Sequence, residues 1–544
     1  MQATSLNPRS SISIEQLKTP LQSTESSALL NALRRVSEPL YLVDNHVRDD
    51  VGSGANVNKG ELTRDQISGM VLPCSPEKLG DQSFCRDHNL RYAYVGGSMA
   101  KGISSVPMVQ AFARQGMLGF FGSAGLSLEA VEAAIDQLQQ NCPEQIFGLN
   151  LIHSPSEPEL EKALVELYIQ RGVTLIEASA FLALTLPVIR FRTHGLYRNA
   201  EGQVVAPNRI IAKVSREEVA ARFFAPPPEK FLKQLVGSGD LTADQAEMAR
   251  EIPVAQDVTV EADSGGHTDN RPALALFPTI AAQKEEFQKK YSYTTKLRVG
   301  LGGGIATPAS AAAAFAMGAA YLVTGTVNQA CRESGTCDEV RAMLAETRQA
   351  DITMAPSGDM FEMGVKVQVV KRGTMFAIRA HKLYDLYRAY GSIENLPVAE
   401  REKLEKTFFR APLTTIWAQT KDYFSVRDPR QVEKAEADPK YKLALVFRWY
   451  LGQSPDWANR GDASRKIDYQ IWCGPAMGAF NEWVKGSFLE KPEQRDVATI
   501  AYNLLYGAAL MKRADQVKQQ IEHIDFPIDA LAPMTIDQIK EFLS

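Results

Sequence analysis

Eight short strand-like segments, most of them separated by helical patterns, occupy the sequence from about residue 91 to residue 324. The segments, each ending in small or polar residues, are Tyr92–Val95, Met117–Phe121, Ile146–Leu151, Val173–Ala178, Arg209–Val214, Val258–Ala262, Leu297–Gly300 and Tyr321–Thr324. Between them, segments such as Leu128–Leu138 and Glu157–Gln170 repeat apolar residues at intervals of three and four, as an amphipathic helix does. Eight alternations of strand and helix favour an α/β fold, a closed (β/α)8 TIM barrel.

A glycine-rich loop follows the seventh strand-like segment. It reads GLGGGIATP over residues 300–308 and leads into an alanine-rich helical pattern. Glycines let several backbone N–H groups converge on an anion, and the helix adds the positive end of its dipole. The eighth segment repeats this plan with Gly325 and Thr326, and two such units suit the phosphate of a flavin or a sugar phosphate. An open doubly wound sheet is the alternative, but its phosphate glycines usually follow the first strand.

Composition shifts divide the rest of the chain. Residues 1–28 are rich in Ser, Thr, Gln and Pro and are predicted to form a flexible leader, followed by an N-terminal cap at 29–85 and the barrel at 86–345. More than forty residues separate the fifth and sixth strand-like segments, so an insertion at about 216–256, with Thr242 as a helix N-cap, is expected to form a lid. Long amphipathic patterns such as Val398–Phe409 and Val497–Met511 predict a mostly helical C-terminal domain at 346–544.

Charge and cysteine usage exclude several classes of protein. A formal net charge of −4 and a pI near 6.1 give no general reason to expect nucleic acid as a partner. No apolar run reaches the roughly eighteen residues of a membrane helix, so no membrane association is predicted. The six cysteines include no CxxC pair and the chain starts without an apolar signal core, which predicts a reduced, cytoplasmic protein. The seven histidines are dispersed without metal-ligand spacing, so no metal site is predicted.

The end of the sixth strand-like segment is the first place to look for catalysis, because barrel enzymes place reactive groups where strands end. His267 follows Gly265 and Gly266 there, and an imidazole can move a proton near neutral pH. A purely structural histidine is the alternative. Asp263 or Asp269 could fix its tautomer, or each could cap a turn.

Lys213 lies inside an apolar strand-like segment, where a buried ammonium group requires an anionic partner. That partner is either a reduced flavin or a salt bridge to Glu177 or Glu261. At the end of the third segment, Asn150 can donate to and accept from a pyrimidine-like edge. At the end of the first, Gly96, Gly97, Ser98 and Met99 offer backbone amides to a flat ring, or form a tight turn without a ligand.

Two further patterns bear on function. A basic set could receive a phosphate or an acidic protein, or form a solvated face; it comprises Lys366, Lys371, Arg372, Arg379 and Lys382. A barrel of the IMP dehydrogenase type also has a phosphate cradle, but it needs a cysteine nucleophile upstream of the cradle. No cysteine lies between Cys142 and Cys331, so this interpretation loses its central residue.

The glycine motifs with His267 resemble the FMN-dependent barrel family that includes nitronate monooxygenases and the flavin-type bacterial enoyl-ACP reductase. Longer strings, EADSGGHTDNRP at 261–272, DMFEMGVKVQ at 359–368 and YQIWCGPAMGAF at 469–480, resemble the PfaD family. That family provides the separate enoyl reductase of polyunsaturated fatty acid synthases and of trans-acting polyketide assembly lines.

The resemblance implies a function and a set of site residues. It implies FMN in the barrel mouth, NADPH as reductant, and a trans-2-enoyl thioester on the acyl carrier protein domains of a multidomain synthase as substrate. A nitronate monooxygenase is the alternative, and a homodimer is predicted because barrel relatives are often dimers. His267 and Lys213 are the implied catalytic residues. Residues implied to line the flavin ring and ribityl chain are Gly96, Gly97, Ser98, Met99, Asn150 and Lys213, and those implied near its phosphate are Gly265, Gly266, Gly302, Gly303, Gly304, Gly325 and Thr326.

Overall fold

The structure is a computed structural model that describes residues 30–43, 46–47, 67–155, 157–520 and 531–543. Two compact units divide the chain, and the larger comprises Pro76–Ala508 and Leu531–Ile539. The predicted leader at 1–28 lies outside the described residues.

The smaller unit contains an antiparallel sheet in the order β2-β1-β3, built from β1 (Leu40–Val43), β2 (His46–Val47) and β3 (Ile67–Val71). It also contains the last turns of α20 (Val497–Lys518). There the buried Arg513 donates hydrogen bonds to the backbone carbonyls of Ala32, at 3.2 Å, and Glu38. Two nitrogens of this buried guanidinium therefore have backbone acceptors within the unit.

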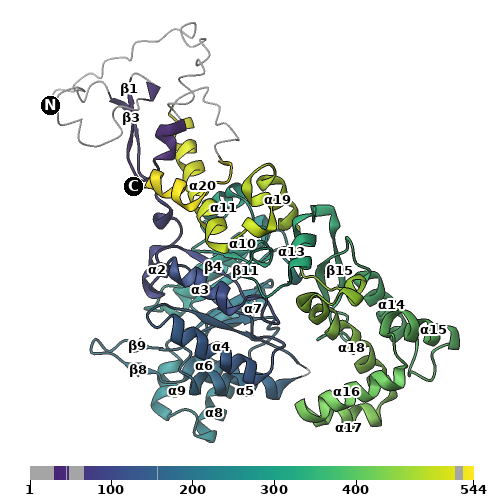
Figure 1. Ribbon diagram of the computed structural model, residues 1–544. Coiled ribbons are helices and arrows are strands. Elements are labelled where there is room, and N and C mark those ends of the chain that lie inside the picture. Colours follow the sequence, from purple (N-terminus) through teal and green to yellow (C-terminus); the bar gives the residue numbers. More distant parts are fainter. Residues whose placement is uncertain (1–29, 44–45, 48–66, 156, 521–530, 544) are drawn as a thin grey trace, which may run out of the picture. The chain divides into compact units, whose positions relative to one another are not determined.

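The larger unit is built around a closed barrel of parallel strands, which confirms the predicted TIM barrel (Figure 1). The strands are β4 (Tyr94–Gly96), β5 (Leu118–Phe121), β6 (Gly148–Ile152), β7 (Leu175–Ser179), β10 (Arg209–Val214), β11 (Asp257–Glu261), β13 (Arg298–Gly302) and β14 (Leu322–Thr324). Pairing of β14 with β4 closes the barrel. Every predicted strand-like segment overlaps one strand, with ends that differ by at most two residues.

Helices follow most of the strands. They are α3 (Val106–Arg114), α4 (Leu128–Asn141), α5 (Pro158–Gln170), α6 (Leu186–Thr193), α7 (Glu217–Phe224), α8 (Glu229–Ser238), α9 (Ala243–Ala249), α10 (Ala273–Tyr291), α11 (Pro308–Ala316), α12 (Thr326–Gln329) and α13 (Asp338–Ala345). The insertion between β10 and β11 forms α7 to α9. Thr242 caps α9 as predicted: its hydroxyl accepts from the Gln245 N–H at 3.1 Å, and the Gln245 side chain accepts from the Thr242 N–H at 3.1 Å. A hairpin of β8 (Tyr197–Arg198) and β9 (Val204–Val205) precedes β10.

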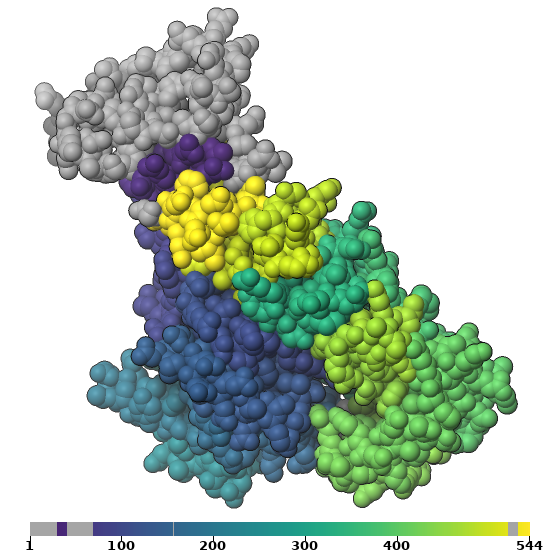
Figure 2. All heavy atoms as spheres, viewed as in Figure 1, coloured from purple at the N-terminus to yellow at the C-terminus, as the bar shows by residue number. Residues whose placement is uncertain are grey.

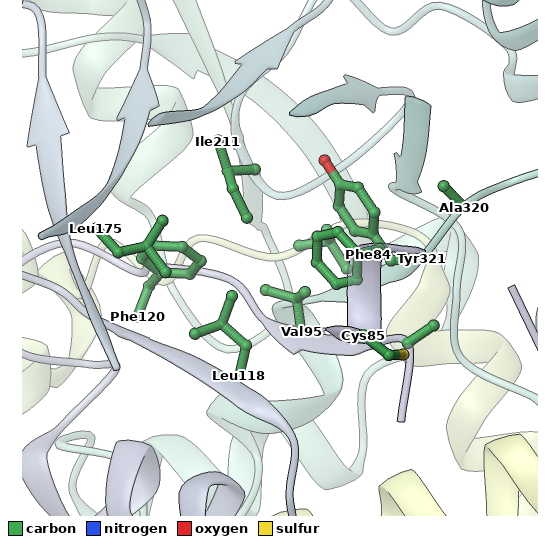
Figure 3. Close-up of a cluster of buried hydrophobic side chains, with 11 residues drawn as sticks. Phe84, Cys85, Val95, Leu118, Phe120, Leu175, Ile211, Ala320 and Tyr321 are labelled. Carbon is green, nitrogen blue, oxygen red and sulfur yellow. The ribbon is translucent and has the colours of Figure 1, made fainter. Parts of the chain in front are cut away.

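Apolar packing closes the N-terminal end of the barrel (Figure 3). The short helix α2 (Gln82–Asp87) places Phe84 against Tyr321, with ring centroids 4.1 Å apart and nearly parallel planes. Both residues are fully buried, as are Leu118, Phe120 and Leu175 around them. The filled interior leaves the C-terminal ends of the strands for a ligand.

A buried ionic network lies beside the apolar packing at this end of the barrel. Arg298, the first residue of β13, donates to both carboxylate oxygens of Asp257 at 2.6 and 3.0 Å and to Asp87 at 2.6 Å. His88 Nε2 lies 2.9 Å from the same Asp257 carboxylate. Arg298 and Asp257 are about 1 % exposed, so each charge depends on its partner.

Beyond the barrel, the structure adds two strands to the region that was predicted to be mostly helical. Strands β15 (Ile352–Pro356) and β16 (Lys366–Val370) join β12 (Gly266–His267) in an antiparallel sheet of order β12-β16-β15. The β-branched run in β16 explains its conformation. Its partner β12 is a two-residue strand about a hundred residues upstream, too short to leave a periodic pattern.

The rest of this region is helical, as predicted. Its helices are α14 (Phe376–Ala389), α15 (Val398–Lys403), a π-helical stretch (Leu404–Phe409), α16 (Leu413–Arg427), α17 (Pro429–Ala437), α18 (Pro439–Arg460), α19 (Ala476–Val484), α20 and α21 (Ile536–Leu543). Short 3-10 turns lie at Pro76–Lys78, Gln349–Asp351, Ala463–Asp468, Phe488–Glu490 and Pro492–Gln494. Arg427 of α16 forms an ion pair with Glu157, beside α5, at 2.6 Å. In Figure 2, atoms of the helical C-terminal region, coloured green, meet atoms of the barrel, coloured blue. In the part of the chain that is described, no helix is long and apolar enough to cross a membrane.

Candidate active site

A cavity opens at the C-terminal ends of the barrel strands. All the residues predicted to form the site line it, with the exception of Gly96: they are Gly97, Ser98, Met99, Asn150, Lys213, Gly265, Gly266, His267, Gly302, Gly303, Gly304, Gly325 and Thr326. The structure therefore brings together residues from the ends of six barrel strands and from the loops that follow them.

Gly96 has a different place. It is buried in β4, and a Cβ atom at this position would lie 2.2 Å from the ring of Phe112 in α3. The missing side chain lets the helix pack closely on the strand. Gly96 thus contributes to packing beneath the site, while its neighbour Gly97 lines the cavity.

The loop after β13 has the geometry of an anion cradle. Gly303 and Gly304 have φ angles of +88° and +77°, which favour glycine. The backbone N–H groups of Gly303, Gly304 and Ile305 have no hydrogen-bond partner among the described residues. Helix α11 begins just beyond, with its N-terminus capped by Thr307. Unpaired N–H groups beside a helix N-terminus suit a phosphate.

The loop after β14 contributes a second set of donors. The N–H groups of Gly325 and Thr326 likewise have no partner in the described part of the chain, and both residues line the cavity. The Thr326 hydroxyl accepts a hydrogen bond from the Gly474 N–H at 3.3 Å. Two glycine loops on adjacent strands thus face one cavity.

Lys213 belongs to a cluster of charges on three adjacent strands. Its Nζ lies 3.2 Å from Glu261 Oε1 and 4.0 Å from Glu177 Oε2, so the salt-bridge alternative is present with both acids. Burial alone would lower the pKa of Lys213, but the two carboxylates raise it, and the ammonium group remains charged.

Glu177 is the fully buried member of this cluster. This burial raises the pKa of its carboxyl. Its Oε2 accepts from the Ser98 N–H at 2.8 Å and from the Ser98 hydroxyl, whereas its Oε1 is buried without a hydrogen bond. Asn150 Nδ2 donates to the Glu177 carbonyl at 3.2 Å and to Ser179 at 3.1 Å, so Asn150 Oδ1 is the part of the amide left for a ligand.

His267 lies in β12 at the edge of the cavity, and its partner differs from both aspartates considered in the sequence. Its Nε2 lies 3.1 Å from Asp359 Oδ1 and 3.1 Å from the Ser357 hydroxyl, which itself donates to Asp359. Burial would lower the pKa of His267, but Asp359 and the more distant Glu261 raise it above its usual value. The ion pair also outweighs burial at Asp359 and holds the pKa of its carboxyl far below the usual range.

The two aspartates proposed from sequence have other partners. Asp263 accepts hydrogen bonds from Asn270 and Gln368, both at 2.8 Å. Asp269 forms an ion pair with Arg216 at 2.8 Å. Asp359 was not singled out from the sequence, and the DMFEMGVKVQ string that contains it was the only signal available.

The segment at 472–476 also reaches the cavity and was not predicted to do so. Trp472 and Ala476 line it, whereas no described lining residue comes from the insertion at 216–256. A Cβ atom at Gly265 would lie 3.0 Å from backbone atoms of Cys473, so this segment packs directly on the glycines before His267. The wall of the site opposite the barrel therefore comes from the C-terminal region.

The basic set at 366–382 does not form one free patch. Arg379 pairs with Asp468, Lys382 with Glu400 at 3.0 Å, and Arg372 with Glu346 at 3.5 Å, while Lys366 and Lys371 are exposed.

Within the described residues, no group of His, Cys, Asp and Glu side chains could hold a metal ion. Backbone donors, the Lys213 cluster and His267 are the polar groups that the cavity brings together.

Comparisons with known proteins match this architecture. Residues 390–469 match a family model described as the inserted helical domain of [acyl-carrier-protein] S-malonyltransferase. The crystal structure of the enoyl reductase domain of MlnA, from the macrolactin biosynthesis cluster of Bacillus amyloliquefaciens, is 40 % identical with a TM-score of 0.77; the match covers 81 % of this chain and 99 % of that one.

Two curated relatives extend the likeness. A component of the polyunsaturated fatty acid synthase of a Thraustochytrium species is 45 % identical over 94 % of this chain and 33 % of its own length. Polyketide biosynthesis protein PksE of Bacillus subtilis is 45 % identical over 80 % of this chain and 56 % of its own length. The chain thus spans between a third and just over half of these two longer proteins.

Proposed function

This chain belongs to the PfaD family, the enoyl reductases associated with polyunsaturated fatty acid and polyketide synthases, and we propose its function from that membership and from the geometry of the cavity. The proposal is an NADPH-dependent, FMN-containing enoyl reductase. Its substrate is a trans-2-enoyl thioester carried by the acyl carrier protein domains of a multidomain synthase. The observation that carries the proposal is a single cavity in which unpaired glycine N–H groups, Lys213 and His267 meet.

The residues present fit FMN. Gly303 and Gly304 turn through positive φ angles, and the N–H groups around them and at Gly325 and Thr326 lack partners among the described residues, as a phosphate site requires. Asn150 and Lys213 supply polar groups for the edge of a flavin ring. When bound, FMN supplies hydride transfer between NADPH and the β-carbon of the enoyl thioester.

The protein residues have three separate tasks in this scheme. The glycine loops bind the phosphate. Lys213, kept charged by Glu177 and Glu261, places a positive charge against the flavin ring, where negative charge develops on reduction. His267 provides a proton for the α-carbon of the substrate, because its ion pair with Asp359 favours the protonated imidazole.

The remaining parts of the proposal follow from the relatives. The relatives are a polyunsaturated fatty acid synthase component, a polyketide biosynthesis protein and an enoyl reductase domain, and they support carrier-bound acyl chains as substrates. A homodimer and a cytoplasmic location are kept as predictions from the sequence.

A steady-state assay tests the function. The purified chain, reconstituted with FMN, is given NADPH and a crotonyl thioester of a carrier protein, with and without oxygen, and the acyl product is identified by mass spectrometry. We expect NADPH consumption in both conditions, with formation of the saturated butyryl thioester. Oxygen-dependent turnover of an alkyl nitronate, with no reduction of the enoyl thioester, would instead identify a nitronate monooxygenase.

A further inference from the structure

The small sheet β12-β16-β15 joins His267 to a carboxylate from a distant part of the chain. Asp359 lies in the connection between β15 and β16, and His267 lies in β12, which pairs directly with β16 through His267 and Val367. The sheet therefore fixes the backbone on both sides of the His267–Asp359 contact. Their side chains are each about three-tenths exposed, so the pair lies at the cavity edge.

The contact assigns different tasks to the two ring nitrogens. Nε2 is held by Asp359 and Ser357, both at 3.1 Å. A carboxylate only accepts, so Nε2 carries a hydrogen in both the neutral and the charged ring. Nδ1 has no hydrogen-bond partner among the described residues, and His267 lines the cavity. Nδ1 is therefore the nitrogen that exchanges its proton with a group in the cavity.

We propose that Asp359 is a positioning residue that holds Nε2–H of His267 and thereby makes Nδ1 the proton donor to the substrate. This inference rests on the proposed reductase function and names the atom and the residue that directs it. Without Asp359, the ring could rotate or exchange tautomers, and Nδ1 would present a proton less often.

The proton transfer balances with the hydride transfer. FMN held by the glycine loops would supply the hydride for the β-carbon; with that electron pair the C=C bond would become a single bond, and negative charge would develop at the α-carbon, where His267 acts. The proton on Nδ1 forms the new Cα–H bond and leaves a neutral His267, which regains a proton from water. NADPH, the reductant of the proposed function, restores the reduced flavin.

Three charged groups act on His267, and they define the expected pH dependence. Asp359 and Glu261 raise its pKa, whereas Lys213 lowers it. Turnover that needs protonated Nδ1 is therefore full below the pKa of His267 and falls as pH rises through it. Removing the Asp359 charge shifts that fall to lower pH.

The first test reads His267 without any turnover. The full chain is labelled with 13C,15N-histidine, and the ring signals are followed by NMR from pH 5 to 9, with His267→Gln identifying the resonance. In the wild type, we expect protonated Nε2 throughout and a titration above the usual histidine value. Asp359→Asn should lower the His267 pKa, whereas Asp269→Asn, which removes a nearby carboxylate paired with Arg216, should not.

The second test measures kcat for the enoyl thioester against pH in the same variants. Asp359→Asn should lower kcat about tenfold or more at pH 8 and less at pH 6, with KM nearly unchanged, since general acids contribute roughly 10²–10⁴-fold. Asp359→Glu should restore part of the loss because it restores the charge.

The two tests separate the possible failures. An unchanged His267 pKa and Nε2 protonation in Asp359→Asn would overturn the inference, as would a kcat loss of equal size at every pH. A wild-type chain that reduces no enoyl thioester would overturn the proposed function and the donor role with it, while the NMR titration would still decide whether Asp359 controls the ring.

Discussion

Replacement of Gly303 by alanine tests whether the glycine cradle shapes the site. Gly303 has a φ of +88°, and a Cβ atom there would lie 2.8 Å from the carbonyl carbon and oxygen of Ala262 and 2.9 Å from the Asp263 oxygen. These are backbone atoms that cannot rotate away. Since ordinary contact begins at 3.4 Å, the two loops must separate by about 0.6 Å.

The expected loss in free energy of unfolding has two parts. An alanine in the left-handed region costs about 1–2 kcal/mol. Overpacking adds about 1–3 kcal/mol. The displaced residues Ala262 and Asp263 lead directly to His267, so Gly303→Ala should weaken FMN binding at least about tenfold, equivalent to about 1.4 kcal/mol, and should also lower turnover.

Gly239→Ala is the matched control. Gly239 follows α8 with a φ of +80°, and a Cβ atom there would meet nothing within 4 Å. This variant should be destabilised only by the left-handed conformation of the alanine, without the overpacking, and should bind FMN normally. The assay is a thermal melt of each apoprotein followed by a fluorescence titration with FMN. A Gly303→Ala protein that melts and binds FMN like Gly239→Ala would refute the reasoning.

Other predictions concern single side chains. His267→Ala should keep FMN but lose about 10²-fold in turnover, as expected for a general acid, and wild-type turnover would contradict this role. Lys213→Met should slow flavin reduction by NADPH in stopped-flow measurements, and an unchanged rate would argue against its placement beside the flavin. Asp257 has a lowered pKa because Arg298 and His88 outweigh its burial, so it stabilises the fold above the unfolded carboxyl pKa and this stabilisation is lost as acid protonates it. Asp257→Asn should therefore lower the melting temperature more at pH 7 than at pH 3; an equal loss would contradict the ionic role. Trp472→Ala should raise KM for the enoyl thioester and Trp472→Phe much less, because Trp472 lines the cavity, and equal KM values would exclude this contact.

The barrel was predictable because its signals are local. Each strand is a short, mostly apolar segment such as Arg209–Val214, and the glycine motifs lie at the strand ends or a few residues beyond them. Parallel strands with helical connections then bring Lys213, His267 and the glycine loops to one end of the barrel without further information. Lys213 shows the limit of this reasoning, because the sequence left the flavin and the salt bridge open and the structure contains the salt bridge.

The missed features depend on contacts between distant segments. Asp359 is 92 residues from His267 along the chain, and only the pairing of β12 with β16 brings them together. Trp472 reaches the cavity because Gly265 lets the segment at 472–476 approach its backbone. For Gly96, the decisive contact is the Phe112 ring, which no motif records. Periodicity and spacing describe neighbours in sequence, so these long-range contacts leave no pattern to read.

An anaerobic absorbance experiment on the FMN-reconstituted chain tests the central claim most directly. NADPH is added first and a crotonyl thioester of a carrier protein second, while the flavin bands are recorded. We predict that NADPH bleaches the bands and that the enoyl thioester restores them without oxygen, with one saturated thioester formed for each flavin. Bands that return only when air is admitted, or a protein that cannot bind FMN, would contradict the assignment of this chain as a flavin-dependent enoyl reductase.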